Sequence, residues 1–374
     1  MRIMHLLKHG VRGNGHVHVA VDLACLQADA GHEVSFVSSG GSYDQLLSDH
    51  GVRVATIPES GGVMGTVRSA ASLLQLARSV RPDVLHAHMM SSAVLGFPIA
   101  KVVGAPLITT MHNSFEKHSV LMRLGKVVVA VSEAERRLLL SRGYPASKVV
   151  TVLNGADGSP REELEADDIG PLARPCVVTL SGLHKRKAVG GVIAAFAEVL
   201  PDFPNWHLNV IGWGPERERL EQVVAELGVE QSVHFLGSTL APRPLLLTAD
   251  IFASASLADP CPLAIAEARA AGCAIVATAV GGVPEILDHG NAGQLVPASD
   301  PPAMAAAFRS LMGDAELLAS WRARASHGSE YFTVIRMARD YDRVYESMLA
   351  ARHRPGWLDA SVRSTPDREG STAE

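Results

Sequence analysis

Short, almost continuous apolar runs alternate with amphipathic stretches along most of the chain. In the first half, runs typical of strands are RIMHLL, EVSFVSS, VRVATIP, DVLHAH, PLITTMH, KVVVAVS and VVTVLN. The stretches between them, such as HVAVDLACLQADA and TVRSAASLLQLARSV, have the spacing of helices. Apolar strands separated by helices are typical of a parallel sheet that is covered on both faces. The pattern therefore predicts an open α/β domain.

A polar segment interrupts this alternation near the middle of the chain. Residues 156–175, ADGSPREELEADDIGPLARP, are acidic and contain three prolines, which is typical of a connection between domains. The alternation then restarts with CVVTLSG, WHLNVIG, VHFLG, DIFASAS, AIVATA and GQLVP, separated by predicted helices that include 188–200, 215–227 and 262–272. Two doubly wound parallel-sheet domains are predicted, at residues 1–160 and 176–330, with a linker at 161–175.

The C-terminal part of the chain differs from both domains. We expect a helix over about 330–352 to pack back on the first domain. The tail 354–374 is polar and contains Pro, Gly and Ser, and it is predicted to be disordered.

Composition and charge narrow the class of protein. The chain of 374 residues is 47% hydrophobic and 20% charged, as soluble globular proteins are. Its net charge of −5 provides no overall basic field, so nucleic-acid binding is not expected. No long apolar window could span a membrane, and the N-terminus does not resemble a signal peptide. Peripheral contact with the inner face of a membrane is left open.

Cysteine usage indicates the compartment. Cys25, Cys176, Cys261 and Cys273 form no C-x-x-C pair and no metal-ligand spacing. A reducing, cytoplasmic location is therefore predicted.

Glycines follow the first predicted strand. Gly10, Gly13 and Gly15 precede a helix, where glycines allow backbone N–H groups to approach a phosphate. The sequence does not form G-x-G-x-x-G, and Glu33 precedes the second strand, whereas the ribose-binding acid of a dinucleotide site follows it. A plain turn and a ligand-binding loop both fit this segment.

Histidines also stand at strand ends. His112 ends a strand and is followed by Asn113, which places it either in a ligand cleft or in a structural role. His86 and His88 lie on one face of a strand, but no third ligand stands at a recognisable spacing, so no metal site is predicted.

A basic turn precedes the first helix of the second domain. His184, Lys185, Arg186 and Lys187 crowd this helix N-terminus, where cations oppose the helix dipole. An anion bound between the basic side chains and the helix N-terminus would neutralise the positive charge of both. A solvated basic turn also fits. The D-x-D pair of Asp340 and Asp342 lies in a helical pattern near the C-terminus and is predicted to be a surface feature.

Two carboxylates frame a later helix start, in DPCPLAIAEARAAG. Asp259 lies in the loop, Pro262 suits the first turn, and Glu267 falls about one turn into the helix. Between the acids lies a helix N-terminus, which binds anions. Acids repel phosphates but accept hydrogen bonds from hydroxyls, so this spacing fits a nucleotide sugar, in which a diphosphate separates two sugars.

In this order and spacing the motifs resemble those of the retaining glycosyltransferases of family 4, which have the GT-B fold. The resemblance covers residues 1 to about 350. It includes HAH, TMH, AVSEAERRLL, VLNGAD, SGLHKRKAV, VIGWGPERERLE, VHFLGS, ADIFASAS, the acid pair and GGVPEIL.

The resemblance implies roles for individual residues. Asp259 would contact the donor hexose, Glu267 the ribose and Lys187 the diphosphate, and His112 would lie beside the reacting sugar. The implied catalytic residues are thus His112, Lys187 and Asp259. The implied donor-binding residues are Gly13, Gly15, Arg186, Lys187, Asp259, Leu263, Ala264 and Glu267.

Three positions depart from the family pattern. The first acid is usually Glu, so Asp259 is one methylene shorter. Leu183 stands where an arginine is usual, and Lys185 or Arg186 would have to replace it. Pro262 stands where a glycine is usual and removes one backbone donor.

The predicted function is hexosyl transfer from a nucleotide-diphosphate sugar to a glycan or lipid-linked glycan in surface polysaccharide biosynthesis. The expected mechanism is retaining and requires neither a metal nor another cofactor. The second domain would bind the donor and the first the acceptor. Two alternatives stay open: a catalytically inactive sugar-nucleotide-binding protein and an NAD(P)-dependent oxidoreductase.

Overall fold

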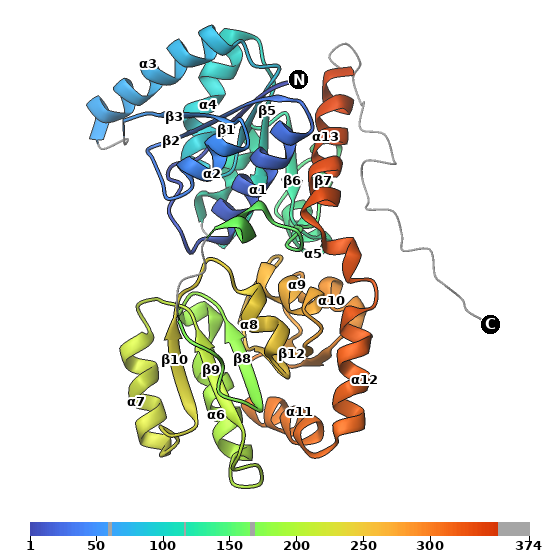
Figure 1. Ribbon diagram of the computed structural model, residues 1–374. Coiled ribbons are helices and arrows are strands. Elements are labelled where there is room, and N and C mark those ends of the chain that lie inside the picture. Colours follow the sequence, from blue (N-terminus) through green and yellow to red (C-terminus); the bar gives the residue numbers. More distant parts are fainter. Residues whose placement is uncertain (59–61, 116, 165–168, 351–374) are drawn as a thin grey trace, which may run out of the picture. The chain divides into compact units, whose positions relative to one another are not determined.

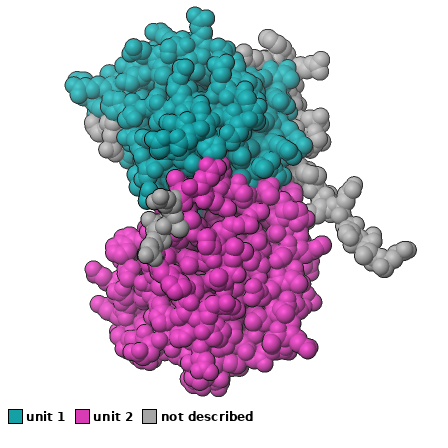
Figure 2. Space-filling view, viewed as in Figure 1, with its two compact units in different colours: residues 1–12, 16–154, 334–374 teal, residues 13–15, 155–333 magenta. Residues whose placement is uncertain are grey.

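The chain folds into two compact units, which we describe separately. The structure is a computed structural model and describes residues 1–58, 62–115, 117–164 and 169–350. Unit 1 comprises residues 1–12, 16–154 and the chain from Val334 onward, and unit 2 comprises residues 13–15 and 155–333 (Figure 2). The tail predicted at 354–374 and residues 165–168 of the predicted linker lie outside the described residues.

Unit 1 contains a seven-stranded parallel sheet flanked by helices (Figure 1). The strand order is β3-β2-β1-β4-β5-β6-β7, the arrangement of a doubly wound sheet. The strands are β1 (Arg2–Leu6), β2 (Glu33–Ser38), β3 (Arg53–Thr56), β4 (Val84–Ala87), β5 (Leu107–Met111), β6 (Val127–Ala130) and β7 (Val149–Thr151). The α-helices are α1 (Gly15–Asp29), α2 (Asp44–Asp49), α3 (Gly62–Val80), α4 (Met90–Val103), α5 (Glu133–Ser141) and α13 (Val334–Ala350).

The two faces of this sheet differ in chemistry because successive residues of a strand point to opposite sides. Met4 and Leu6 of β1, with Leu85 and Ala87 of β4, belong to an apolar core into which helices α3 and α4 also pack. The residues between them on these strands face the other side. They include His5 and His86, which are register partners in the β1–β4 pair, and His88, Thr110 and His112 follow the same alternation. One face of the sheet therefore has a polar track.

Helix α13 belongs to unit 1, although it follows unit 2 in the chain. Tyr341, Tyr345 and Met348 on one side of it are fully buried. Arg336 donates hydrogen bonds to the carbonyl oxygens of Leu153 and Asn154, at 2.8 and 3.2 Å. These contacts attach the helix beyond the end of β7.

Unit 2 contains a six-stranded parallel sheet in the order β10-β9-β8-β11-β12-β13. The strands are β8 (Cys176–Leu180), β9 (His207–Ile211), β10 (Val233–Gly237), β11 (Ile251–Ser254), β12 (Ala274–Thr278) and β13 (Gln294–Val296). The α-helices are α6 (Val189–Val199), α7 (Arg217–Leu227), α8 (Arg243–Thr248), α9 (Leu263–Ala270), α10 (Val283–Ile286), α11 (Pro301–Gly313) and α12 (Ala315–Ser326). The prediction of two parallel-sheet α/β domains is confirmed.

Short 3₁₀ helices occupy several of the connections. They are η1 (Lys117–Leu124), η2 (Ala146–Lys148), η3 (Pro160–Glu163), η4 (Lys185–Lys187), η5 (Asp288–Gly290) and η6 (Ser329–Phe332). Among the described residues, no helix is both long and apolar enough to cross a membrane.

Candidate functional site

The basic turn of unit 2 lies at the carboxyl end of β8, in the short helix η4 before α6. The Lys187 Nζ donates to the Asp259 Oδ2 at 2.5 Å. Arg186 Nη1 donates to the Ala258 carbonyl at 2.8 Å and lies 3.8 Å from the same Asp259 oxygen. The Asp259 side chain is 8% exposed and that of Lys187 is 19% exposed. Two cations thus meet one carboxylate at this strand end, as the strand-end rule for α/β sheets leads us to expect.

Of the two basic residues proposed to replace the missing arginine, Arg186 lies at this carboxylate. Lys185 is exposed, and no side-chain hydrogen bond or ion pair of Lys185 is found in the described part of the chain. The structure therefore favours Arg186 as the second cation of the site.

The position assigned to the missing arginine needs correction. Leu183 is fully buried in the apolar core of unit 2. Its backbone N–H donates to the Trp213 carbonyl at 2.9 Å. An arginine at position 183 would bury its charge among apolar side chains instead of reaching a ligand.

The loop that carries Asp259 is fixed by two glycines of GGVPEIL. Gly282 N–H donates to the Asp259 carbonyl at 3.0 Å. Gly281 has φ +53°, and a Cβ built on it would lie 1.9 Å from the same carbonyl oxygen. Only glycine allows the two loops to approach this closely. This explains why the Gly-Gly pair accompanies the acid.

Helix α9 begins one residue later than predicted. Pro262 is the N-cap residue, with ψ 119°, and is not in the first turn. Neither Leu263 nor Ala264 has a backbone acceptor for its N–H among the described residues. Such free N–H groups at a helix N-terminus are donors for an anion.

Glu267 lies further along α9 beside a buried cation that sequence analysis missed. Arg161 Nη2 is 3.9 Å from Glu267 Oε1, and the side chains are 4% and 15% exposed. Arg161 was placed in the polar linker, whereas it is buried in η3. No sequence pattern linked these two residues, because the contact joins segments about a hundred positions apart.

The first loop contributes residues to both units. Gly13–Gly15 group with unit 2, whereas Arg12 and His16 group with unit 1. Gly13 has φ +80°, which a residue with a side chain rarely adopts. The assignment of Gly13 and Gly15 to donor binding stays a prediction.

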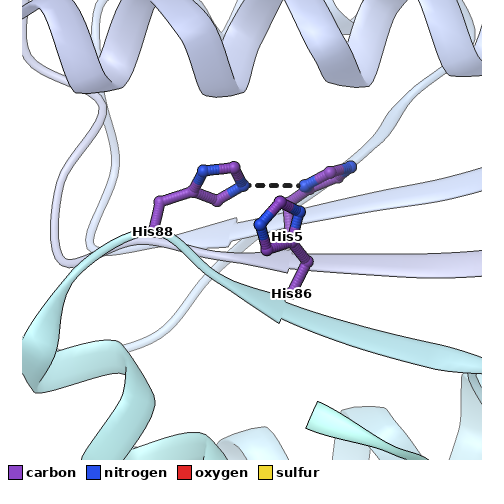
Figure 3. A group of neighbouring side chains, drawn as sticks. All are labelled: His5, His86 and His88. Atoms are coloured by element: carbon purple, nitrogen blue, oxygen red, sulfur yellow. Dashed lines mark hydrogen bonds between the residues drawn. The ribbon is translucent and has the colours of Figure 1, made fainter. Parts of the chain in front are cut away.

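His112 of unit 1 is half-buried and ends a chain of side chains on the polar face of the sheet. Its Nε2 lies 3.2 Å from the His88 Nδ1. The His88 Nε2 lies 3.0 Å from the His5 Nδ1, and the His5 Nε2 lies 2.9 Å from the Gln27 Oε1 (Figure 3 shows the His5–His88 contact). His112 is therefore tied to a network that reaches helix α1.

His5, His86 and His88 offer nitrogen atoms within 4.8 Å of one another, which is close enough for a metal ion (Figure 3). Each of their six ring nitrogens, however, already has a hydrogen-bond partner. His86 contacts the Tyr345 hydroxyl at 2.6 Å and the Thr110 hydroxyl at 2.7 Å. A metal would have to displace these bonds. The geometry is that of a hydrogen-bonded network.

Burial determines the charge of these rings. It lowers the pKa of His5 to about 4, against an opposing effect of the Gln27 hydrogen bond. Burial, with nearby histidines adding to it, also holds the pKa values of His86, His88 and His112 well below the ordinary value. The cluster is therefore uncharged at neutral pH.

The prediction that Asp340 and Asp342 form a surface pair is wrong, because their side chains are only 16% and 18% exposed. Asp342 is the acid that joins the histidine network. Its Oδ1 accepts a 2.7 Å hydrogen bond from the Gln27 Nε2. Its Oδ2 lies 3.4 Å from the His32 Nε2, and burial raises the pKa of its carboxyl group. The prediction of a helix at these residues was correct. The two acids alone did not indicate which face of α13 packs against the sheet.

Comparison with known proteins identifies the family. Residues 13–159 match the family described as Glycosyltransferase Family 4, and residues 174–314 match the family described as Glycosyl transferases group 1. The two matches together span most of the chain. The chain therefore belongs to the group 1, family 4 glycosyltransferases, and it is a glycosyltransferase with the GT-B fold. The oxidoreductase alternative is set aside by this result.

Individual relatives extend over nearly the whole chain. The chain is 27% identical to a phosphatidyl-myo-inositol mannosyltransferase of Mycolicibacterium smegmatis, over 91% of this chain and 92% of that protein. It is 26% identical to an N-acetyl-alpha-D-glucosaminyl L-malate synthase of Bacillus anthracis, over 88% and 93%. The crystal structure of Anabaena Alr3699/HepE in complex with UDP and glucose superposes with a TM-score of 0.81, at 22% identity, over 93% of this chain and all of that one.

Proposed function

We propose that this glycosyltransferase retains the anomeric configuration of its donor and moves a hexosyl unit from a nucleotide-diphosphate sugar. The acceptor is a glycan or lipid-linked glycan in surface polysaccharide biosynthesis. Unit 2 binds the donor and unit 1 binds the acceptor. The reaction needs no metal ion.

The Lys187–Asp259 pair is the observation that carries this proposal. A diphosphate that approaches Lys187 competes with the Asp259 carboxylate for the same ammonium group. When the diphosphate has replaced Asp259 as the partner of Lys187, the Asp259 carboxylate is available to accept a hydrogen bond from a hydroxyl. A carboxylate accepts hydrogen bonds and repels phosphate. A ligand with a sugar joined directly to a diphosphate uses both partners at once.

The rest of the donor follows helix α9. The free N–H groups of Leu263 and Ala264 suit a phosphate oxygen, and Glu267 suits the ribose hydroxyls. Lys187 and Arg186 then stabilise the charge that develops on the leaving nucleoside diphosphate. The cations do the work that a divalent metal does in other transferases.

The relatives support the same class of reaction. The names of two of them refer to mannosyl transfer and to an N-acetylglucosaminyl product. The Anabaena protein was crystallised with UDP and glucose. A nucleotide donor carrying a hexose is consistent with all three.

A panel of nucleotide sugars tests the proposal. Binding to the native state raises the unfolding temperature, so the donor should stabilise the protein where the other nucleotide sugars of the panel do not. The donor so identified is then incubated with candidate acceptors in the presence of EDTA, and the anomeric configuration of the product is determined by NMR. Transfer with retention in EDTA is expected. Donor binding without transfer or hydrolysis would indicate an inactive binding protein, and magnesium-dependent activity would exclude the metal-independent mechanism.

A further inference from the structure

We propose that a hydrogen-bonded chain, buried in its middle part and half-buried at its two ends, fixes the tautomer of His112. Its members, in order, are Asp342, Gln27, His5, His88 and His112. The chain keeps the Nε2 of His112 protonated and leaves its Nδ1 as an acceptor for a sugar hydroxyl. This inference rests on the proposed role of His112 in transfer. The other four members are positioning residues, because they act only through His112.

The direction of the chain is set by Asp342. An ionised carboxylate has no proton to donate, so the Gln27 side chain must turn its amide NH₂ toward Asp342. The 2.7 Å contact joins the Gln27 Nε2 to the Asp342 Oδ1. The Gln27 Oε1 therefore faces His5. The reverse orientation would place two acceptors against each other at Asp342.

The orientation of Gln27 determines the next proton. The Gln27 Oε1 can only accept, so the His5 Nε2, at 2.9 Å, carries the hydrogen. In a neutral ring the other nitrogen is then an acceptor. His5 Nδ1 therefore accepts from the His88 Nε2 at 3.0 Å.

The same alternation passes from His88 to His112. His88, now protonated at Nε2, has a free lone pair at Nδ1, and this atom accepts from the His112 Nε2 at 3.2 Å. His112 consequently has its lone pair on Nδ1. No described residue forms a hydrogen bond with that atom. A hydroxyl of a bound sugar can donate to it.

Burial makes this direction strict. Gln27 and His5 are fully buried and His88 is 2% exposed, so water cannot supply an alternative partner to these three middle members. The alternation also requires every ring to be neutral, and the low pKa values of the three histidines meet that requirement. His5 lies in β1, Gln27 in α1 and Asp342 in α13, and His88 and His112 directly follow β4 and β5. The C-terminal helix thereby reaches the proposed reacting residue.

His86 lies against the chain but outside it. Its two nitrogens bond to Tyr345 and Thr110 and not to His5 or His88. Thr110 also contacts the Tyr341 hydroxyl at 3.1 Å. Removing the Thr110 hydroxyl should therefore disturb a buried hydrogen bond of the same face without changing the tautomer of His112. Thr110→Val is the matched control.

The tautomers can be measured directly. In protein labelled with ¹⁵N only in histidine, long-range ¹H–¹⁵N correlations distinguish Nδ1–H from Nε2–H rings, and the His112 signals are assigned by their loss in His112→Ala. The expected result for the wild type at neutral pH is an Nε2–H tautomer at His112. An Nδ1–H tautomer there would overturn the proposal, whether or not any variant folds.

Two substitutions test the origin of the effect. Gln27→Met keeps the volume but removes the acceptor for His5, and the Nδ1–H form of His112 should then become populated. Gln27→Glu combined with Asp342→Asn keeps the net charge and the acceptor for the His5 Nε2–H, while the bond between positions 27 and 342 is reversed, with the new amide at position 342 donating to the new carboxylate at position 27. It should restore the wild-type tautomer. Unchanged tautomers in Gln27→Met, or equal changes in Gln27→Met and Thr110→Val, would show that the chain is only structural.

Kinetics then connects the tautomer with turnover. In Gln27→Met, kcat should fall by the fraction of molecules in the wrong tautomer, while donor affinity stays at the wild-type value. The NMR result is independent of activity. A wild-type Nε2–H tautomer at His112 in a protein with no transferase activity would support the hydrogen-bonded chain and reject the proposed function. An Nδ1–H tautomer in an active transferase would reject the hydrogen-bonded chain alone.

Discussion

Lys187 is the single residue on which the donor site of unit 2 depends most. It holds Asp259 at 2.5 Å, and we assign it to the leaving diphosphate. Lys187→Ala should therefore lower kcat/KM about 100- to 1000-fold, the usual effect of removing one transition-state donor. The measurement is the rate of sugar transfer from the donor that the nucleotide-sugar panel identifies. The variant is first shown by circular dichroism to be folded.

The neighbouring Lys185 provides the control for this substitution. It is exposed, and Lys185→Ala should keep activity within about threefold of the wild type, because surface groups outside a site contribute little. A Lys187→Ala enzyme with nearly full activity would remove Lys187 from the site.

Sequence analysis located some site residues and missed others for a definite reason. Asp259 and Lys187 could be brought together because both follow strands of one parallel sheet, whose carboxyl ends meet at one edge. Arg161 and Gln27 could not, because their contacts depend on long-range packing. Position 183 was assigned to the ligand site, whereas the Leu183 side chain points into the apolar core, and residue spacing does not record the direction of a side chain.

At the scale of elements, the glycine loop before α10 holds the acid loop before α9. Gly281→Ala should destabilise the protein and weaken donor binding, because the new Cβ would lie 1.9 Å from the Asp259 carbonyl oxygen. The positive φ alone costs about 1–2 kcal/mol for a residue with a Cβ. Chemical denaturation and donor titration measure the two effects.

Gly228, the C-cap of α7, separates these effects. Its φ is +68°, and a Cβ there would meet nothing within 4 Å. Gly228→Ala should show the conformational cost of a positive φ with unchanged donor affinity. If both variants bind the donor like the wild type, the glycine loop does not position Asp259.

The polar face of the unit 1 sheet predicts how stability depends on pH. The pKa of His5 is about 4 when folded, against 6.5 for an ordinary histidine. The unfolded chain therefore binds more protons between these values, and the free energy of unfolding falls as the pH drops from about 6.5 toward 4. His5 alone accounts for a loss of about 3 kcal/mol over that range. The titratable groups packed on this face include His86, His88, His112, Asp342, Tyr341 and Tyr345.

Denaturation of the full chain at a series of pH values checks this expectation. His5→Phe should be less stable at pH 7 but should lose less on acidification. Replacing the exposed His118 by Gln should leave the pH profile unchanged. A wild-type free energy of unfolding that stays constant between pH 7 and pH 4.5 would show that folding does not lower the pKa values of the cluster, and would contradict this expectation.

Whole elements were more predictable than their ends. Every strand expected from an apolar run is present, because a strand buried on both faces needs such a run. Helix α9 begins one residue later than predicted because Pro262 is its N-cap. A proline in the sequence does not show whether it is the N-cap or the first helical residue. The polar residues within the runs, such as His5 and His86, had no visible purpose until the strands were paired.

At the scale of the whole molecule, the proposal divides the reaction between two units. His112 belongs to unit 1, whereas the donor is assigned to unit 2. His112→Ala should therefore lower kcat while nucleotide-sugar affinity, measured by calorimetry, changes little. His118→Ala, an exposed histidine of the same unit, should alter neither quantity. A large loss of affinity with a normal kcat at saturation would make His112 a binding residue.

The central claim is that Asp259 and Glu267 hold the two ends of one nucleotide sugar. Both the nucleoside diphosphate and the intact donor carry the ribose, so Glu267→Gln should weaken both ligands. Asp259→Asn should weaken only the intact donor, since it removes a hexose contact and also frees Lys187 for the diphosphate. Each lost hydrogen bond to a charged group is worth roughly 1.5–3 kcal/mol, or about one to two decades in affinity.

The most direct measurement is the calorimetric titration of the wild type and both variants with the nucleoside diphosphate and with the nucleotide sugar. The account predicts that Glu267→Gln binds both ligands weakly, and that Asp259→Asn binds the nucleoside diphosphate at least as tightly as the wild type but the nucleotide sugar weakly. Equal behaviour of the two variants toward the two ligands would contradict it.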